Sequence, residues 1–329
     1  MPDAESSLHE VRVAAVQAAP VSFDRSRTID KLADLAADAA RDGAKFVVFP
    51  EAFISAYPRG LDFGTVIGAR APEGREWYRL YAESSLSIPS PDFDRVCTVA
   101  AQNRIHLNVG VIERAGATLY CTTLLFGPDG AFLSKHRKLM PTGSERLVWG
   151  QGNGSTLSVT QTPFGKVGTV ICWENYMPLL RAAMYAKGIE IYCAPTADGR
   201  ETWLPTMRHI AQEGRVFVIS ANQFCRRRDY PASYPTAFGD EPDTVMATGG
   251  SCIIGPLGNV IVEPCRDREA IIAADLDLRE LLRARYDFDV VGHYSRPDIF
   301  KLMVDERAQP GVSVLSDGAV GSHGDASEP

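Results

Sequence analysis

The sequence predicts a single α/β domain in which parallel strands alternate with helices. The first unit of this pattern is the clearest. Residues 11–16 form a short apolar run, residues 28–40 carry apolar side chains at helical spacing, and residues 46–49 form a second apolar run. Two strands joined through a helix within about 40 residues form a crossover unit, which places the strands parallel. No linker rich in Gly, Ser or Pro interrupts residues 8–308, so one continuous domain is favoured over two.

The same alternation continues along the chain. Further helices are expected at residues 93–102, 178–187 and 201–213. Further strands are expected at residues 106–112, 118–126, 131–134, 165–172, 189–194, 216–221, 251–254, 260–262 and 270–275. Gly43 and Gly188 end two of the helices, as glycine commonly does at a helix C-terminus.

The two ends of the chain differ from this domain. We expect residues 1–9 to form an N-terminal extension and residues 10–308 to form the single domain. Beyond about residue 311 the composition changes to Gly, Ser, Asp and Glu with few apolar side chains. Such a segment cannot bury enough apolar surface to fold, so residues 309–329 are expected to be a disordered tail.

Composition and charge restrict the function classes. The chain has 329 residues, of which 45% are hydrophobic and 23% charged, and its net charge is −7. A mildly acidic chain is a poor partner for nucleic acid or an anionic membrane, so a small ligand is expected instead. We find neither a signal-peptide pattern nor an apolar run long enough for a transmembrane helix. The seven scattered cysteines, without a CxxC pair, then indicate reduced thiols and a cytoplasmic location.

Reactive side chains lie at or near the ends of expected strands. Cys172 ends one apolar strand and precedes a helical stretch, so a helix dipole would lower its thiol pKa. Glu51 follows another strand, at the position where α/β proteins bind ligands. Lys138 ends a short basic run, and Glu145 follows it. Each position also has a simpler interpretation, in which Cys172 is a core thiol and the charged residues are solvated.

Taken together, these stretches resemble the nitrilase superfamily of carbon–nitrogen hydrolases. The matching stretches are Val48-Phe49-Pro50-Glu51-Ala52-Phe53, Lys135-His136-Arg137-Lys138-Leu139-Met140-Pro141-Thr142 and Cys172-Trp173-Glu174-Asn175. The resemblance runs from about residue 10 to about residue 305. It implies a four-layer αββα sandwich, a catalytic triad of Glu51, Lys138 and Cys172, and Glu145 as a second active-site glutamate.

Within the superfamily the sequence is most similar to true nitrilases of the plant-type and aryl-aliphatic kind. The stretches that carry this similarity are Glu145 to Gly152, Cys172 to Glu174, Arg181 to Gly188, Cys193 to Gly199 and His293 to Asp298. The resemblance implies a small nitrile substrate, either an aryl-aliphatic nitrile or β-cyanoalanine. It also implies a homo-oligomer based on dimers, since relatives form dimers and spirals.

The residues expected to bind the substrate are Tyr57, Trp173, Glu174 and Thr196. Tyr57 and Trp173 are equally consistent with ordinary core aromatics. No cofactor and no metal are expected. The six histidines show neither an HExxH motif nor paired metal spacing, and no GxxxxGK[ST] or GxGxxG stretch follows a strand.

These residue types suit nitrile hydrolysis. A thiolate from Cys172 would attack the nitrile carbon, with Glu51 as the general base and Lys138 stabilising the developing charge. Glu145 would orient Lys138 or the attacking water. Two alternatives remain open: an amidase or N-carbamoyl hydrolase that uses the same triad, and a non-catalytic scaffold or filament-forming protein.

Overall fold

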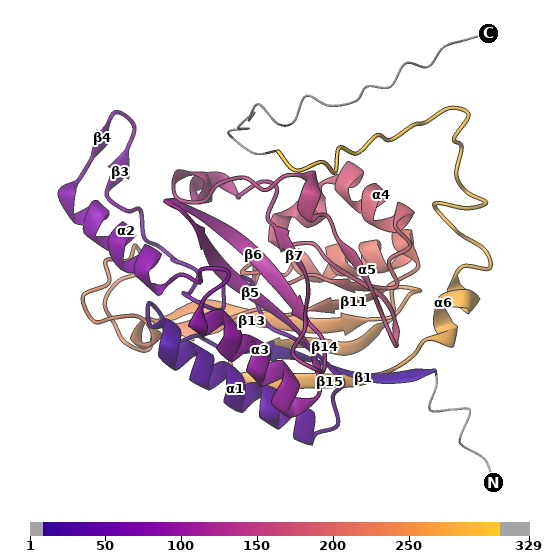
Figure 1. The fold of residues 1–329 in the computed structure, drawn as a ribbon, viewed down its shortest axis with the longest axis horizontal. Helices are drawn as coiled ribbons and strands as arrows, with labels where there is room; N and C mark the ends of the chain where they lie inside the picture. Colours follow the sequence, from indigo (N-terminus) through magenta and orange to yellow (C-terminus); the bar gives the residue numbers. More distant parts are fainter. Residues whose placement is uncertain (1–8, 310–329) are drawn as a thin grey trace, which may run out of the picture.

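Two β-sheets face each other at the centre of the protein, and helices cover their outer faces (Figure 1). The computed structural model describes residues 9–309. The N-terminal extension expected at 1–9 lies outside the described residues except for His9, and the tail expected at 309–329 lies outside them except for Gln309.

Within residues 9–309 the first sheet has six strands, in the order β15-β1-β2-β5-β6-β7. They are β1 (Glu10–Gln17), β2 (Phe46–Val48), β5 (His106–Ala115), β6 (Thr118–Phe126), β7 (Phe132–Arg137) and β15 (Ala270–Asp277). Strands β1, β2 and β5 run parallel, and the outer strands pair antiparallel. The parallel pair β1 and β2 is the one that the crossover pattern predicts.

The second sheet follows the order β12-β13-β11-β10-β9-β8, and β14 also pairs with β13. Its strands are β8 (Val159–Thr162), β9 (Gly165–Thr169), β10 (Ile191–Cys193), β11 (Phe217–Ser220), β12 (Phe224–Arg226), β13 (Val245–Ile254) and β14 (Val260–Arg266). Strands β9, β10 and β11 are parallel. Each sheet therefore has parallel strands whose carboxyl ends can gather functional side chains.

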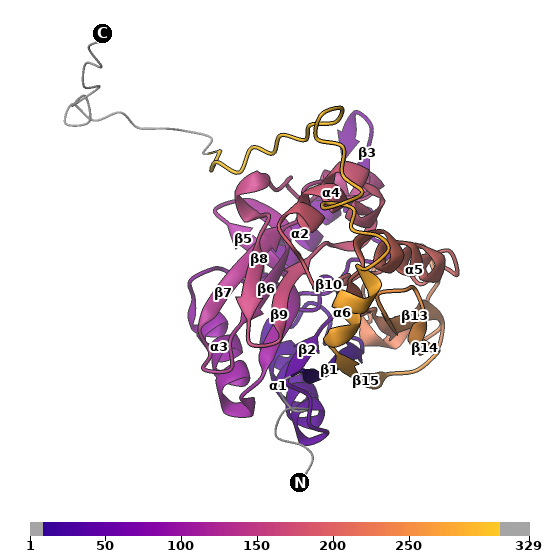
Figure 2. The same ribbon diagram turned by 90° about the vertical axis from the view of Figure 1, so that its right-hand side faces the viewer.

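The helices form the two outer layers. Helices α1 (Arg25–Arg41) and α3 (Pro91–Asn103) pack on the first sheet, where Ile29 and Leu32 meet Val47. Helices α4 (Pro178–Ala186) and α5 (Trp203–Gly214) pack on the second sheet. Figure 2 shows the two helix layers on opposite sides of the sheets. Between the sheets, Val48 belongs to the same apolar cluster as Ile191. The predicted αββα sandwich is confirmed.

Smaller elements extend this sandwich. Helix α2 (Pro72–Ser84) and the hairpin of β3 (Thr65–Val66) and β4 (Ala69–Arg70) project from one end of the sandwich (Figure 1). Helix α6 (Arg279–Ala284) is followed by an extended segment that runs over the surface to residue 309. All seven cysteines are unpaired and six are buried, as expected for reduced thiols. Among residues 9–309 no helix combines the length and apolarity needed to cross a bilayer.

Candidate active site

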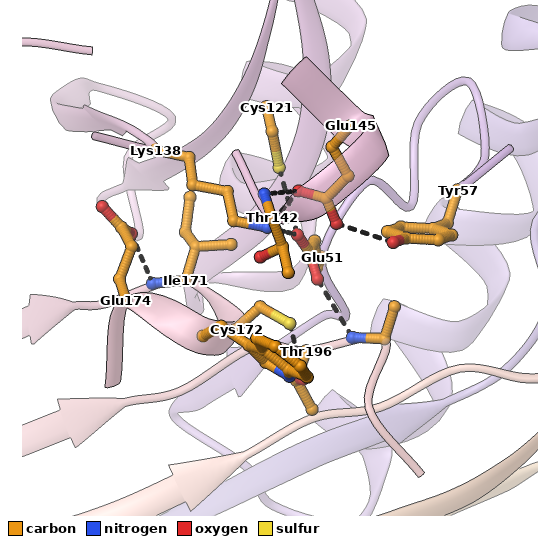
Figure 3. Close-up of polar contacts among 12 residues, drawn as sticks. Glu51, Tyr57, Cys121, Lys138, Thr142, Glu145, Ile171, Cys172, Glu174 and Thr196 are labelled. Carbon is orange, nitrogen blue, oxygen red and sulfur yellow. Dashed lines mark hydrogen bonds and ion pairs between the residues drawn. The ribbon is translucent and has the colours of Figure 1, made fainter. Parts of the chain in front are cut away.

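The two sheets contribute different parts of one site. Glu51 follows β2, and Lys138 directly follows β7, both in the first sheet. Cys172 follows β9 of the second sheet, after two intervening residues. Figure 3 shows the three side chains converging, with the Cys172 sulfur beneath the Glu51 carboxylate. The structure therefore brings together residues that lie far apart in sequence.

Lys138 is the centre of the polar network. Its Nζ donates to Glu51 Oε1 at 2.7 Å and to Glu145 Oε2 at 2.8 Å, and its side chain is fully buried. Burial alone would lower the pKa of Lys138, but the neighbouring carboxylate of Glu51 and the other acidic groups nearby raise it well above its usual value. Lys138 therefore remains a fixed cation, suited to stabilising negative charge that develops beside it.

Glu51 is held by three donors. Besides Lys138, the Ala197 backbone N–H donates to Oε2 at 3.0 Å, and the Cys121 thiol lies 3.5 Å from Oε1. Gly110 packs closely against the backbone before Glu51, and a side chain does not fit there because a Cβ would lie 2.2 Å from Pro50 O. Burial raises the pKa of Glu51, against the opposing effect of Lys138. A carboxylate with a raised pKa is a competent general base near neutral pH.

Cys172 adopts an unusual backbone conformation. Its φ is +51°, in the left-handed region that residues other than glycine rarely enter, and it begins a short 3-10 helix, Cys172–Tyr176. Its backbone N–H donates to Pro195 O at 2.9 Å, and Thr196 Oγ1 donates to its sulfur at 3.2 Å. The preceding strand, β9, ends at Thr169 and not at Cys172. The expectation from the sequence that Cys172 ends the strand is therefore wrong, because two residues separate them.

The electrostatics of Cys172 also differ from the expectation. Burial raises the pKa of its thiol, and the Glu51 carboxylate raises it further. The lowered thiol pKa expected from a helix dipole is therefore wrong, because loss of solvent outweighs a dipole from a short 3-10 turn. The resting nucleophile is a thiol, so it must lose its proton to a base as it attacks.

Glu145 sits on a second 3-10 turn, Gly143–Leu147. Its Oε2 accepts from Lys138 and from the Thr142 backbone N–H, the latter at 2.6 Å. Its Oε1 accepts from the Tyr57 hydroxyl at 2.6 Å. Trp149 packs against both Tyr57 and Lys138: its ring forms a T-shaped pair with Tyr57, and its centroid lies 5.6 Å from Lys138 Nζ. Glu145 is therefore a fixed carboxylate beside both Lys138 and the pocket.

A pocket of about 560 Å³ opens onto the Cys172 sulfur. Tyr57 and Trp173 provide aromatic walls, and Trp173 is 40% exposed. Charged groups line the remainder: Arg59 donates to Ala197 O at 2.6 Å, and Asp198 pairs with Arg200 at 2.6 Å. The pocket thus offers both apolar and charged surface next to the thiol.

Most of the site residues predicted from the sequence lie at this pocket. Glu51, Lys138, Glu145 and Cys172 lie together, and Tyr57 and Trp173 line the pocket. Thr196 is fully buried and contacts the sulfur rather than open pocket space.

Glu174 does not fit its predicted substrate-binding role. Its carboxylate is buried away from the pocket and accepts from Leu139 N at 2.6 Å and Ile171 N at 2.9 Å. These hydrogen bonds, together with a contact to His136, leave no oxygen free for a ligand.

The sequence did not predict three residues that lie at the site. Cys121 lies on β6 next to Glu51, and Arg59 and Asp198 line the pocket. None belongs to a spacing pattern with a chemical meaning of its own, so only tertiary structure reveals them. Within residues 9–309 no group of three or more His, Cys, Asp or Glu side chains has a geometry that could hold a metal ion.

Comparison with known proteins adds to this geometry. Residues 12–286 match the family model described as carbon-nitrogen hydrolase. The chain is 54% identical to a bifunctional nitrilase/nitrile hydratase NIT4A of Lupinus angustifolius, over 93% of this chain and 89% of the relative. It is 54% identical to an aliphatic nitrilase of Sinorhizobium fredii, over 92% and 97%. Among solved structures, a carbon-nitrogen hydrolase from Helicobacter pylori matches 89% of this chain and 97% of its own at 22% identity, with a TM-score of 0.70.

Proposed function

The chain belongs to the carbon–nitrogen hydrolase family, and we propose that it is a nitrilase that uses Glu51, Lys138 and Cys172 to convert a nitrile to a carboxylic acid and ammonia. The observation that carries the chemistry is the buried Lys138, held by Glu51 and Glu145 beside the Cys172 thiol. The observation that favours nitriles over amides is the 54% identity to proteins named nitrilases over more than nine-tenths of the chain.

The first half of the reaction forms a covalent adduct. Glu51 takes the Cys172 proton as the sulfur attacks the nitrile carbon, and that proton passes to the nitrile nitrogen to give a thioimidate. The raised pKa of Glu51 matches it to this transfer, because a weakly basic carboxylate would not remove the proton of a buried thiol. Lys138 stabilises the negative charge that develops on nitrogen.

The second half uses two water molecules. Glu51 takes a proton from the first water as its oxygen adds to the thioimidate carbon, and passes that proton to nitrogen, which gives a tetrahedral species with C–OH and C–NH2 groups. The proton of the C–OH group then also passes to nitrogen as the C–N bond breaks, so that ammonia leaves and a carbonyl forms. The resulting thioester is cleaved by the second water, which breaks the C–S bond and releases the acid and the Cys172 thiol. Glu145 holds Lys138 in place throughout. If the first tetrahedral species loses sulfur instead of ammonia, the product is an amide.

The pocket supports two substrate types. Its aromatic walls, Tyr57 and Trp173, suit an aryl-aliphatic nitrile, and its charged groups, Arg59 and Asp198, suit an amino-acid nitrile such as β-cyanoalanine. We propose a nitrile of one of these two kinds as the substrate.

We also propose a cytoplasmic homo-oligomer built from dimers. Large apolar side chains on the C-terminal segment support assembly, since Tyr286, Phe300 and Met303 are mostly exposed in the single chain. Light scattering during size-exclusion chromatography tests it. A chain that elutes as a monomer at working concentration contradicts this part of the proposal.

Ammonia release tests the reaction itself. Purified protein without added metal or nucleotide is supplied with 3-phenylpropionitrile, β-cyanoalanine and the amide that corresponds to each. We expect faster turnover of a nitrile than of its amide, with the acid as the main product. The alternative, an amidase or N-carbamoyl hydrolase on the same triad, is correct if an amide or an N-carbamoyl amino acid is turned over faster than every nitrile.

A further inference from the structure

A single buried carboxylate connects the two halves of the proposed site. Lys138 belongs to the first sheet and Cys172 to the second, so their separation depends on how the sheets are joined. Leu139, next to Lys138, donates its backbone N–H to Glu174 Oε1 at 2.6 Å. Ile171, next to Cys172, donates its backbone N–H to Glu174 Oε2 at 2.9 Å. Figure 3 shows Glu174 on the far side of Lys138 from Tyr57, with its bond to Ile171.

His136 completes this arrangement. Its Nε2 lies 3.0 Å from Glu174 Oε2 and 3.3 Å from Oε1, and its Nδ1 lies 3.2 Å from Thr156 O. Both ring nitrogens face acceptors, and both side chains are almost fully buried. With its Nε2 proton the ring donates to the Glu174 carboxylate, so the imidazole is a third contact of that carboxylate beside the two backbone N–H groups.

We propose that Glu174 and His136 are positioning residues that fix the Lys138 segment against the Cys172 segment. Neither is placed in the pocket that opens onto the thiol, so their effect on the reaction passes through the backbone of Leu139 and Ile171. The proposal rests on the assigned triad. Relative displacements of about 1 Å can cost about 100-fold in rate, so a tie between the two segments is mechanistically significant.

The chemistry of the tie requires a carboxylate. Its two oxygens together accept the two backbone N–H groups and the imidazole, and each is an acceptor only. A glutamine in the same place would turn one of its N–H groups toward a backbone N–H or toward His136. One of the two segments would then lose its partner, while the volume of the side chain stays nearly the same.

Glu113 provides a matched control for loss of a buried carboxylate. It is 2% exposed, pairs with Lys135 at 2.6 Å and Arg137 at 2.6 Å, and thus touches the same strand β7 as Glu174 does through His136. Its partners are side chains outside the site. Glu113→Gln should therefore reproduce the stability cost of losing a buried ion pair without moving Lys138 relative to Cys172.

The test is steady-state kinetics of Glu174→Gln and Glu113→Gln on the best nitrile, well below both melting temperatures. We expect kcat of Glu174→Gln to fall by about 100-fold with KM changed less than about threefold, because alignment and not binding is lost. For Glu113→Gln we expect kcat within about twofold of wild type. Wild-type kcat in Glu174→Gln, or equal losses in the two variants, overturns the proposal.

A second pair of variants covers the case in which Glu174→Gln does not fold. His136→Gln retains an N–H donor toward Glu174, and His136→Leu removes it. We expect His136→Gln to keep several-fold more kcat than His136→Leu, and equal kcat in the two overturns the proposal. If wild-type protein turns over no nitrile at all, the assigned function fails, and that outcome is distinct from unchanged kcat in these variants.

Discussion

Removal of the Tyr57 hydroxyl group tests how strongly the role of Glu145 in the reaction depends on the hydrogen bonds that hold its carboxylate. The Tyr57 hydroxyl donates to Glu145 Oε1 at 2.6 Å, while Glu145 Oε2 holds Lys138 at 2.8 Å. Tyr57→Phe deletes the donor and keeps the ring that packs edge-on against Trp149 at 5.6 Å. The substitution therefore removes a single hydrogen bond from the network with little change in packing.

The expected loss follows from the type of bond. A hydrogen bond to a charged group contributes about 1.5–3 kcal/mol, and each 1.36 kcal/mol corresponds to about tenfold in rate. If Glu145 must be fixed for Lys138 to stabilise the tetrahedral species, most of this energy is lost in the transition state. We therefore expect kcat/KM of Tyr57→Phe to fall by about 10- to 100-fold.

The assay is ammonia release from the best nitrile at several substrate concentrations, with Tyr81→Phe as the control. Tyr81 is fully buried, and its hydroxyl donates to the Ala56 backbone carbonyl at 3.0 Å and to no charged group of the site. Tyr81→Phe should lower stability by about 1 kcal/mol and leave kcat/KM nearly unchanged. Wild-type kcat/KM in Tyr57→Phe, or equal losses in both variants, would refute the reasoning.

Further predictions concern the other parts of the site. Glu51→Gln removes the base and should nearly abolish acylation. Glu145→Gln should lower kcat strongly but leave measurable turnover, because it misplaces Lys138 or the water. Stopped-flow and steady-state kinetics distinguish the two effects. Since burial raises the pKa of Glu51 and only its ionised form accepts a proton, kcat/KM should decline as pH falls through a value above the ordinary glutamate range; an acidic limb at about 4.3 contradicts this. Gly110→Ala places a Cβ 2.2 Å from Pro50 O, so it should lower the free energy of unfolding by about 1–3 kcal/mol and also lower kcat. A melting temperature and a kcat equal to those of wild type would show that the Glu51 segment is not held this closely.

Much of the sandwich could be predicted from local patterns. The apolar spacing of residues 28–40 falls within α1 (Arg25–Arg41), and the expected strand at 118–126 matches β6 (Thr118–Phe126). Both elements bury one face or most of their length, which is the condition under which apolar periodicity carries a signal.

Elements with little buried surface were harder to predict. No element was expected between the strand at 46–49 and the helix at 93–102, yet α2 (Pro72–Ser84) lies there. That helix buries only Gly74, Tyr81 and Ser84, so its sequence lacks a broad apolar face. The strand β8 (Val159–Thr162) was also missed, because it is a short edge strand of mostly polar residues that pairs only with β9 in the described sheet.

At the site, motifs identified residue types but not their environments. The resemblance grouped Glu51, Lys138, Glu145 and Cys172, and the structure places these four side chains close together. It could not show that Glu174, one residue beyond Trp173, turns inward to backbone N–H groups while Trp173 faces the pocket. Neighbouring residues in a 3-10 turn point in different directions, so adjacency in sequence does not predict a shared pocket.

The most direct test of the account is the mass of the covalent adduct. A reaction with the best nitrile is quenched in acid during turnover, the intact protein is weighed, and the modified peptide is identified after digestion. We predict a mass increase equal to the nitrile for a thioimidate, or to the acid minus water for a thioester, on the peptide that contains Cys172, and no adduct or turnover in folded Cys172→Ala. Cys121 is the competing thiol, since it lies 3.5 Å from Glu51 Oε1. An adduct on Cys121, or full turnover by Cys172→Ala, would contradict the proposed mechanism.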